Sequence, residues 1–498
     1  MKQRRHLIGP GNGKDMKFSM GDGRLHAILC VLVIMLPIAE GFSQNLRSGS
    51  NRADYIAIAP SRYVGLAEQL ALFRQQQNGY ATMVVSLDTV VAQFTERSTP
   101  DSALRDFIQY ALHSWQDPKP HYVVLVGNRN AVPSHVEAED PDLSQVGHYD
   151  SLCIDHWYVE EFPQQSGYGR AQAALGRLPA WDSTGLAIMI GKQIDYERAT
   201  PAAWWNTSIA LADYDTLTFD FFESQSQDLQ HTLSSIWTDT ATVSINNKSV
   251  HHLGPVDFRK RWDQGAAIVS YCGHANPYVL SATHYFTTST VDSLSNDHRL
   301  PVCFFGGCNL RFDAGPPSSI PTHLLEQPSA GAVACVASAG VMYADIIVST
   351  YRRLFGDLVH NPAHSAGEAF IYAKNANPYE LLRRVTFLGD PAIRIKRPTG
   401  TDIVSQPRKV SADFTLYQNY PNPFHPTTTI RYELPRAAHV TMAIFNMLGQ
   451  QVSLLVNSEQ SAGTHEVSFH GAHLAGGTYI LRMYSGSSSE TMKLILKK

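Results

Sequence analysis

Between residues 52 and 397 the sequence alternates short, continuous apolar runs with amphipathic stretches. The runs show none of the polar alternation of a half-exposed strand; they are Tyr55–Ala59, Thr82–Val85, His121–Val126, Ser208–Ala212, Ala266–Tyr271, Val302–Phe305 and Ala332–Ala337. Apolar residues recur at helical spacing in the intervening stretches, notably Val64–Gln77, 100–115, Ser183–Tyr196 and Phe222–Ile236. Such alternation predicts a mostly parallel sheet covered by helices on both faces. We therefore expect an α/β domain whose function lies just beyond the carboxyl ends of its strands.

The pattern changes after Arg397. Residues 398–412 are rich in Pro, Gly, Thr and Ser and have no periodicity, which predicts a linker. Residues 413–498 contain short alternating runs separated by glycine-rich turns, at Thr428–Leu434, Val440–Phe445, Gln451–Val456, Thr464–Phe469, Thr478–Tyr484 and Glu490–Leu496. Regular short strands with such turns predict a small all-β sandwich.

The amino terminus has the order of a secretory signal peptide. A basic segment precedes an apolar run from Ile28 to Ile38, and small residues follow at 41–43. The run is too short to cross a bilayer as a helix, which needs about 20 residues. We predict a signal peptide at 1–43, cleaved after Ser43, then a short segment at 44–51 and no transmembrane span in the mature chain. A retained membrane anchor is the alternative, and Met16 is an alternative start.

Charge and cysteine content exclude several classes of protein. The 40 basic and 44 acidic side chains give a formal net charge of -4, which offers no reason to expect a nucleic-acid partner. Six cysteines are too few and too scattered for a disulfide scaffold. No spacing of His and Cys, including His251-His252, resembles a zinc ligand set, so we expect no metal in the site. Cys30 leaves with the signal peptide, and five cysteines cannot all pair internally.

The carboxyl-terminal region carries a specific set of motifs. In order they are Asn422-Pro423-Phe424, Phe445-Asn446 through Gly449, Ala462-Gly463-Thr464 and Gly476-Gly477-Thr478-Tyr479. This set resembles the type A sorting domain of the type IX secretion system. The resemblance implies interaction with that secretion machinery, passage through the periplasm and across the outer membrane, and delivery to the cell surface or the medium. An ordinary adhesive β-sandwich is the alternative.

Two predicted strands end in glycine followed by a reactive residue. One runs through Cys272-Gly273 into His274, and the other runs through Gly306-Gly307 into Cys308. If the strands are neighbours, the two side chains meet at one edge of the sheet. A thiol is mostly protonated at neutral pH and needs a base beside it, and histidine can hold that proton and return it to a leaving amine. Backbone amides at Ala275 and Cys308 are the candidate oxyanion donors. A buried structural Cys and His are the alternative.

The order of several further segments resembles the gingipain family of cysteine peptidases. They are Tyr122–Gly127 with Val132-Pro133, Gly176–Ala180, Ile194–Arg198, Gly273-His274, Cys308 with Phe312-Asp313, Ala330–Ala334, Ala366–Ala369 and Leu388–Pro391. The resemblance implies a caspase-like α/β/α fold of two subdomains with mostly parallel sheets, at roughly 52–200 and 201–397. It also implies endopeptidase activity on protein or peptide substrates, with Cys308 as nucleophile and His274 as general base and acid.

The family uses acidic residues ahead of its histidine, and the matching stretch contains three candidates. Asp213 or Asp215 would orient His274, and Asp228 would face a basic side chain in a specificity pocket; a solvated loop carboxylate is the alternative for each. No cofactor is required by this chemistry. Structural calcium is possible at the acidic stretch Glu137, Glu139, Asp140 and Asp142, for which a solvated loop is the alternative.

Three departures from the family leave other functions open. Ala275 replaces a usual glycine, Gly306-Gly307 replace small residues such as Ser-Ala, and a long prodomain is missing before the first strand. A catalytically degenerate surface-binding or adhesive protein is therefore one alternative. A transpeptidase that passes the acyl group to an amine through the same Cys-His pair is another.

Overall fold

The structure is a computed structural model. It describes residues 44–94, 99–138, 151–161, 169–214, 221–315, 318–377 and 379–398, and in the carboxyl-terminal part residues 415–416, 419, 422, 424–434, 437–446, 451–485 and 488–497. The predicted signal peptide at 1–43 and nearly all of the predicted linker at 398–412 lie outside these residues. The α/β part and the carboxyl-terminal part are described separately below.

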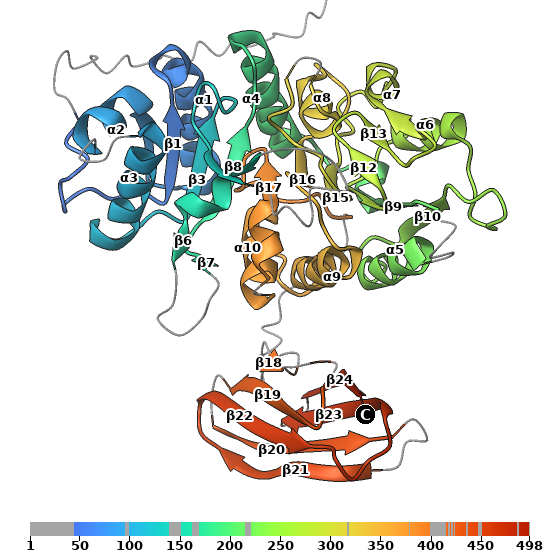
Figure 1. Cartoon of the computed structure of the whole chain (residues 1–498). Helices are drawn as coiled ribbons and strands as arrows, with labels where there is room; N and C mark the ends of the chain where they lie inside the picture. The colour runs from blue at the N-terminus through green and yellow to red at the C-terminus, as the bar shows by residue number, and fades with distance from the viewer. Residues whose placement is uncertain are drawn as a thin grey trace, which may run out of the picture. The chain divides into compact units, whose positions relative to one another are not determined.

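Ten strands of the α/β part form one sheet in the order β10-β9-β11-β15-β16-β17-β8-β3-β1-β2 (Figure 1). Their bounds are β1 Tyr55–Ala59, β2 Thr82–Ser86, β3 Tyr122–Val126, β8 Ala174–Leu178, β9 Thr207–Ala212, β10 Asp239–Ser244, β11 Ile268–Cys272, β15 Val302–Gly306, β16 Ala334–Ser338 and β17 Val385–Leu388. We call residues 52–200 the first half and residues 201–397 the second half. The expected mostly parallel sheet is confirmed, with β17 as the antiparallel exception in the second half.

The strands of the two halves run in opposite directions. β9, β10, β11, β15 and β16 are mutually parallel, and so are β1, β2, β3 and β8. β17 pairs antiparallel with β16 and parallel with β8, through Leu388 and Arg177. The carboxyl ends of the two sets therefore lie at opposite edges of one continuous sheet.

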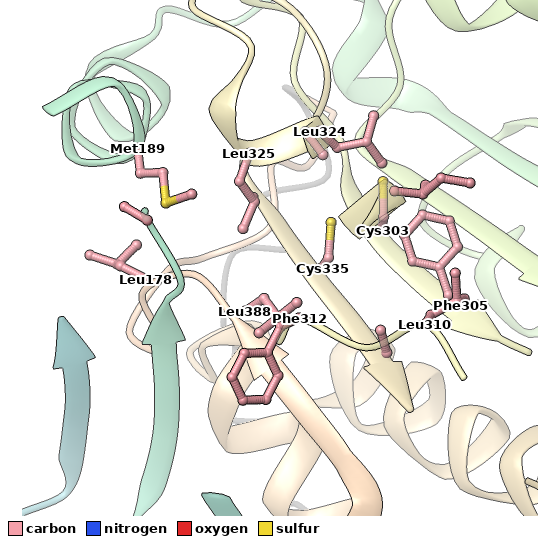
Figure 2. Close-up of a cluster of buried hydrophobic side chains, with 14 of the residues drawn as sticks. Leu178, Met189, Cys303, Phe305, Leu310, Phe312, Leu324, Leu325, Cys335 and Leu388 are labelled. Carbon is pink, nitrogen blue, oxygen red and sulfur yellow. The ribbon is translucent and has the colours of Figure 1, made fainter. Parts of the chain in front are cut away.

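Helices cover both faces, as the apolar runs require. Their bounds are α1 Val64–Asn78, α2 Leu87–Phe94, α3 Pro100–Ser114, α4 Ser183–Arg198, α5 Phe221–Leu233, α6 Pro255–Asp263, α7 Thr288–Asp292, α8 Ile320–Glu326, α9 Ala344–His360 and α10 Ala366–Ala376. One face carries a single buried cluster that spans both halves and includes α1, α4, α6 and α8; part of it is drawn in Figure 2. On the other face α2 and α3 pack on the first half, and α5, α9 and α10 pack on the second.

Three strands and one helix end differ from the sequence expectation. The sequence does not predict β8, β10 or β17 as strands: β10 is a polar edge strand, β8 contains Gly176 and Arg177, and β17 has only four residues and adjoins glycine. α5 ends three residues before Ile236, because the hydroxyls of Ser234 and Ser235 bond back to the carbonyls of His231 and Thr232. Such local bonds compete with helix propagation.

Short elements complete the α/β part. The small strands are β4 His135–Ala138, β5 Ser151–Ile154, β6 Glu160–Glu161, β7 Arg170–Ala171, β12 Ala275–Asn276, β13 Val279–Leu280 and β14 Phe286–Thr287. Short 3₁₀ helices span Ser61–Tyr63, Asp155–Tyr158, Ala203–Asn206 and Glu380–Arg384. Nowhere in the described ranges is there a helix with both the length and the apolarity needed to span a membrane.

The carboxyl-terminal part is the expected antiparallel sandwich. One sheet has the order β18-β19-β22 and the other β21-β20-β23-β24. The bounds are β18 Thr415–Leu416, β19 Thr427–Leu434, β20 Ala438–Phe445, β21 Gln451–Gln460, β22 Gly463–His470, β23 Gly477–Ser485 and β24 Ser488–Leu496. The inward side chains of both sheets form one buried cluster. Asn422 and Phe424 hydrogen-bond the backbone of Ile495, so this motif holds the last strand in place.

Candidate functional site

His274 and Cys308 extend from neighbouring strands at the same register. β11 and β15 are parallel, and Cys272 pairs with Gly306. The Gly273 N–H donates to the Gly306 carbonyl at 3.2 Å, which continues the pairing one step beyond the strands. His274 and Cys308 each lie two residues past the paired positions. The condition set by the sequence is therefore met: both residues follow adjacent strands at the carboxyl edge of the second half.

Cys308 is the partly exposed thiol of this region. Of the five cysteines in the described part of the chain, the other four are buried. Burial raises the pKa of the Cys153 and Cys272 thiols to about 12 and also raises that of Cys303, so these thiols stay protonated at neutral pH. The Cys308 sulfur lies 3.4 Å from both the N–H and the carbonyl oxygen of Met342.

Asp213 holds the residue His274 through its backbone. The buried carboxylate of Asp213 follows β9 and accepts the His274 N–H at 2.9 Å. The Tyr271 hydroxyl lies between the two, 3.3 Å from the Asp213 carboxylate and 2.5 Å from the His274 carbonyl. The imidazole contacts Phe222 edge to face, with 5.4 Å between the ring centroids. Asp213 thus lies beside His274 and contacts its main-chain N–H.

Two glycines of the site are required by close approach. A side chain at Gly273 would overlap the Cβ of Asp213. An added Cβ at Gly307 would lie 2.7 Å from the Cβ of Ala275 and 3.0 Å from the Gly273 carbonyl. The methyl group of Ala275 therefore occupies the space above Gly307, and the two departures from the family pattern compensate each other. Ala275 pairs with Leu280 in β12 and β13.

The other acidic residues singled out in the sequence lie elsewhere. Asp228 is exposed in the middle of α5 and pairs with Arg352 of α9 at 3.2 Å, so the structure does not bring it to His274 or Cys308. Asp215 lies outside the described residues. Of the acidic stretch proposed for calcium, Glu137 pairs with Arg383 at 2.8 Å, and the rest lies outside the described residues. Within the described ranges no group of three or more His, Cys, Asp or Glu is arranged to hold a metal.

Three residues around the pair were not singled out in the sequence. Tyr271, Phe222 and Met342 contact His274, Asp213 or Cys308. Tyr271 sits in an apolar run, where a buried hydroxyl signals a polar partner. Phe222 and Met342 carry no such signal, because their role depends on how α5 and the segment after β16 fold over the edge.

Comparison with known proteins identifies both parts of the chain. The family model for peptidase family C25 matches residues 48–396, and the model for a secretion system C-terminal sorting domain matches residues 418–497. A search of curated proteins found no match.

Solved structures share the fold at low identity. The Arg-specific cysteine proteinase gingipain R (RgpB) matches with a TM-score of 0.57 and 15% identity, covering 91% of this chain and 98% of that one. The complex of the pro- and mature domains of RgpB from Porphyromonas gingivalis matches with a TM-score of 0.57 and 16% identity, covering 89% and 100%. A structure described as a protease matches with a TM-score of 0.54 and 14% identity, covering 90% and 98%.

These matches confirm the caspase-like α/β fold and the resemblance of both parts. The carboxyl-terminal domain marks the protein for type IX export to the cell surface or the medium. Because the first family model covers more than half of the residues, the chain belongs to peptidase family C25, the gingipain family, and ends in a secretion system sorting domain.

Proposed function

We propose that this protein is a cysteine endopeptidase in which Cys308 is the nucleophile and His274 the general base and acid. The observation that carries the proposal is the register of β11 and β15, which sets both residues two positions beyond a paired Cys272 and Gly306. Burial of the other four cysteines supports Cys308 as the reacting thiol. Family membership supports peptide bonds as the substrate.

The reaction follows from the side chains at this edge. His274 takes the proton of the Cys308 thiol, and the sulfur attacks the carbonyl carbon of the peptide bond. The oxyanion that forms is stabilised by backbone N–H groups, for which Ala275 and Cys308 are our candidates. When the intermediate collapses, the C–N bond breaks and His274 gives its proton to the leaving amine. Water then attacks the thioester, releases the acid product and restores the thiol.

Asp213 and Tyr271 support this chemistry by holding the main chain of residue 274. The buried Asp213 carboxylate accepts a hydrogen bond from the His274 N–H and so fixes the turn after β11. The fixed turn sets the position of the His274 Cα, from which the imidazole extends. Phe222 restricts the ring from the side of α5. The complementary fit of Ala275 and Gly307 supports a functional turn despite the extra methyl group, which weakens one reason to expect a degenerate binding protein.

The experiment compares two cysteine variants from the same strand segment. The secreted protein is incubated with a broad peptide library under reducing conditions, as wild type, Cys308→Ala and Cys303→Ala. Cys303 is a buried thiol five positions earlier and serves as the matched control. We expect cleavage by wild type and Cys303→Ala, and none by Cys308→Ala. Undiminished hydrolysis by Cys308→Ala would overturn the assignment.

A second arm separates hydrolysis from acyl transfer. The same incubation is repeated with an added amine such as glycinamide, and the products are weighed by mass spectrometry. Free acids as the main product support the endopeptidase, and amide-extended products support the transpeptidase. Absence of any product from wild type supports the binding or adhesive alternative.

A further inference from the structure

The segment that follows the nucleophile is irregular and yet buried. Residues 309–313 form neither helix nor strand, and each of them is buried. Asn309 has a left-handed backbone, with φ of 56°, and donates its N–H to the carbonyl of Gly340 at 2.9 Å. A buried segment without regular hydrogen bonds needs other partners to keep one conformation. Those partners determine where the Cys308 backbone is held.

Apolar side chains fix part of this segment. Leu310 and Phe312 belong to the buried cluster that spans both halves, together with Leu178 and Leu388 (Figure 2). The Phe312 ring also lies 5.1 Å from the guanidinium of Arg177 in β8. Apolar packing of this kind excludes water from the segment but sets no direction for its main chain.

Asp313 supplies the directional contacts. Only 1% of its side chain is exposed. The carboxylate accepts hydrogen bonds from Nε of Arg311 at 2.9 Å and from Nη2 of Arg311 at 2.6 Å. It also lies 3.3 Å from Nη1 of Arg129 and 3.3 Å from the Cys153 thiol. Arg129 follows β3 and Cys153 lies in β5, so both come from the first half. Arg311 adds a bond to the Ser151 carbonyl at 3.0 Å.

The charges of this cluster depend on one carboxylate. Burial works against ionisation, but the Arg311 guanidinium and the neighbouring donors lower the pKa of Asp313 below its usual value. If the charge is removed, the Arg311 and Arg129 guanidinium groups lose the carboxylate that both of them contact. The directional contact between this segment and Arg129 is then weakened.

We propose that Asp313 is a positioning residue that ties the segment after the nucleophile to the first half of the sheet and thereby sets the orientation of Cys308. This inference rests on the proposed function. It explains why a chain with its reactive pair in the second half keeps the first half in the same sheet: the first half is the support against which the nucleophile segment is held.

The test measures Cys308 directly as well as turnover. Wild type, Asp313→Asn, Asp313→Glu and Asp390→Asn are compared as full-length secreted proteins. Asp390 is the matched control, since it is a buried carboxylate bonded to an arginine, Arg74 Nε at 2.6 Å, and it bonds Arg74 and the Ala392 N–H, both outside 309–313. The readouts are kcat and KM on a cleaved peptide, and the rate at which iodoacetamide labels Cys308 across pH 5–9. The label is located by peptide fragmentation, and rates are normalised to the folded fraction.

For Asp313→Asn we expect kcat to fall about 10- to 100-fold with little change in KM, as for a misplaced reacting group. The labelling rate should fall and its pH profile should shift, and Asp313→Glu should recover part of both. Asp390→Asn should lower stability but leave both readouts near wild type. Equal effects of Asp313→Asn and Asp390→Asn would overturn the proposal.

A milder variant covers the case in which Asp313→Asn does not fold. Arg129→Gln removes one tie to the first half at a side chain that is 40% exposed and leaves the Arg311–Asp313 pair intact. We expect a reduction of about 3- to 10-fold in kcat and in the labelling rate; no change in either overturns the inference. If wild type cleaves no peptide, the proposed function fails, while the labelling rates still decide the role of Asp313.

Discussion

The two halves of the sheet use the ends of their strands in opposite ways. In the second half, β11 ends at Cys272 and β15 at Gly306, each is followed by a glycine, and they lead to His274 and Cys308, which reach solvent. In the first half, the loop after β3 closes over Arg177 of β8, whose guanidinium bonds the Asp155 carboxylate and the carbonyls of Gly127 and Val132. One edge is open for chemistry, and the other is sealed by a buried ion pair.

The difference shows how one sheet separates rate from stability. A reactive pair at an open edge contributes little to folding, because its side chains are exposed or half-exposed. A buried arginine that is fully hydrogen-bonded is costly to disturb. Substitutions of His274 and of Arg177 should therefore affect different measurements.

The largest expected effect is on catalysis, from His274→Ala. Loss of the general base and acid should lower kcat/KM by about 10²- to 10⁴-fold. Because the His274 side chain is exposed, the free energy of unfolding measured in urea should change by less than about 0.5 kcal/mol. All seven tryptophans lie between residues 115 and 262, so tryptophan fluorescence reports on the α/β part alone. A large drop in the free energy of unfolding of His274→Ala would contradict the idea that this edge of the sheet affects rate and not stability.

Arg177→Met tests the sealed edge. Removing one partner of a buried ion pair leaves Asp155 unpaired and should cost about 3–5 kcal/mol of unfolding free energy. Hydrolysis per folded molecule should fall far less than in His274→Ala. The double variant Arg177→Met, Asp155→Leu removes both charges and should be more stable than Arg177→Met alone. If the double variant is the less stable of the two, the cost does not come from the unpaired charge.

Gly307→Ala tests the tight fit at the open edge. The added methyl group would meet the Cβ of Ala275 at 2.7 Å, which should cost about 1–3 kcal/mol in unfolding and reduce turnover. Adding Ala275→Gly should restore most of the unfolding free energy and most of the turnover, since it removes the methyl group that the new side chain meets. The pair is measured as a double-mutant cycle, and additive effects would show that the two positions are not coupled.

The smallest effect concerns a surface link between the halves. His121 precedes β3 and bonds Glu368 of α10 at 2.8 Å. The hydrogen bond to Glu368 raises the pKa of His121, and, against the effect of burial, bonds from His121 and the Ser365 N–H lower the pKa of Glu368 to about 2. The His121 contribution is complete below about pH 6.5 and is lost as pH rises through its folded pKa; the Glu368 contribution is complete above about pH 4.5 and is lost toward pH 2.

His121→Asn should therefore destabilise the protein at pH 5.5 and have little effect at pH 8.5. Half of the His121 side chain is exposed, so solvent screening keeps the difference below about 1 kcal/mol. Urea midpoints at the two pH values measure it. The exposed pair of His113 and Glu161, 3.7 Å apart, provides the control variant His113→Asn, which is measured at the same two pH values. A larger loss at pH 8.5 than at pH 5.5 would contradict the assignment.

Most of the fold could be predicted because strands buried on both faces leave a local signature. Tyr55–Ala59 and Tyr122–Val126 must be apolar throughout, and the alternating strands of the sandwich must not be. β10 and β17 escaped this reasoning, since an edge strand is exposed on one side and a four-residue strand gives too short a pattern. The antiparallel placement of β17, which reverses the first half, depends on its contacts with β16 and β8 and has no local cause.

The candidate site divides in the same way. The sequence by itself determined the parallel α/β class, the sandwich, the two glycine-bounded strand ends and the residues that follow them, because each depends on neighbours along the chain. Only the tertiary structure decided that Asp213 lies beside His274, that Asp228 lies away from it, that Ala275 fills the space above Gly307, and that Asp313 reaches Arg129 and Cys153 in the other half. These contacts join residues far apart in the chain, and packing between separate elements sets them.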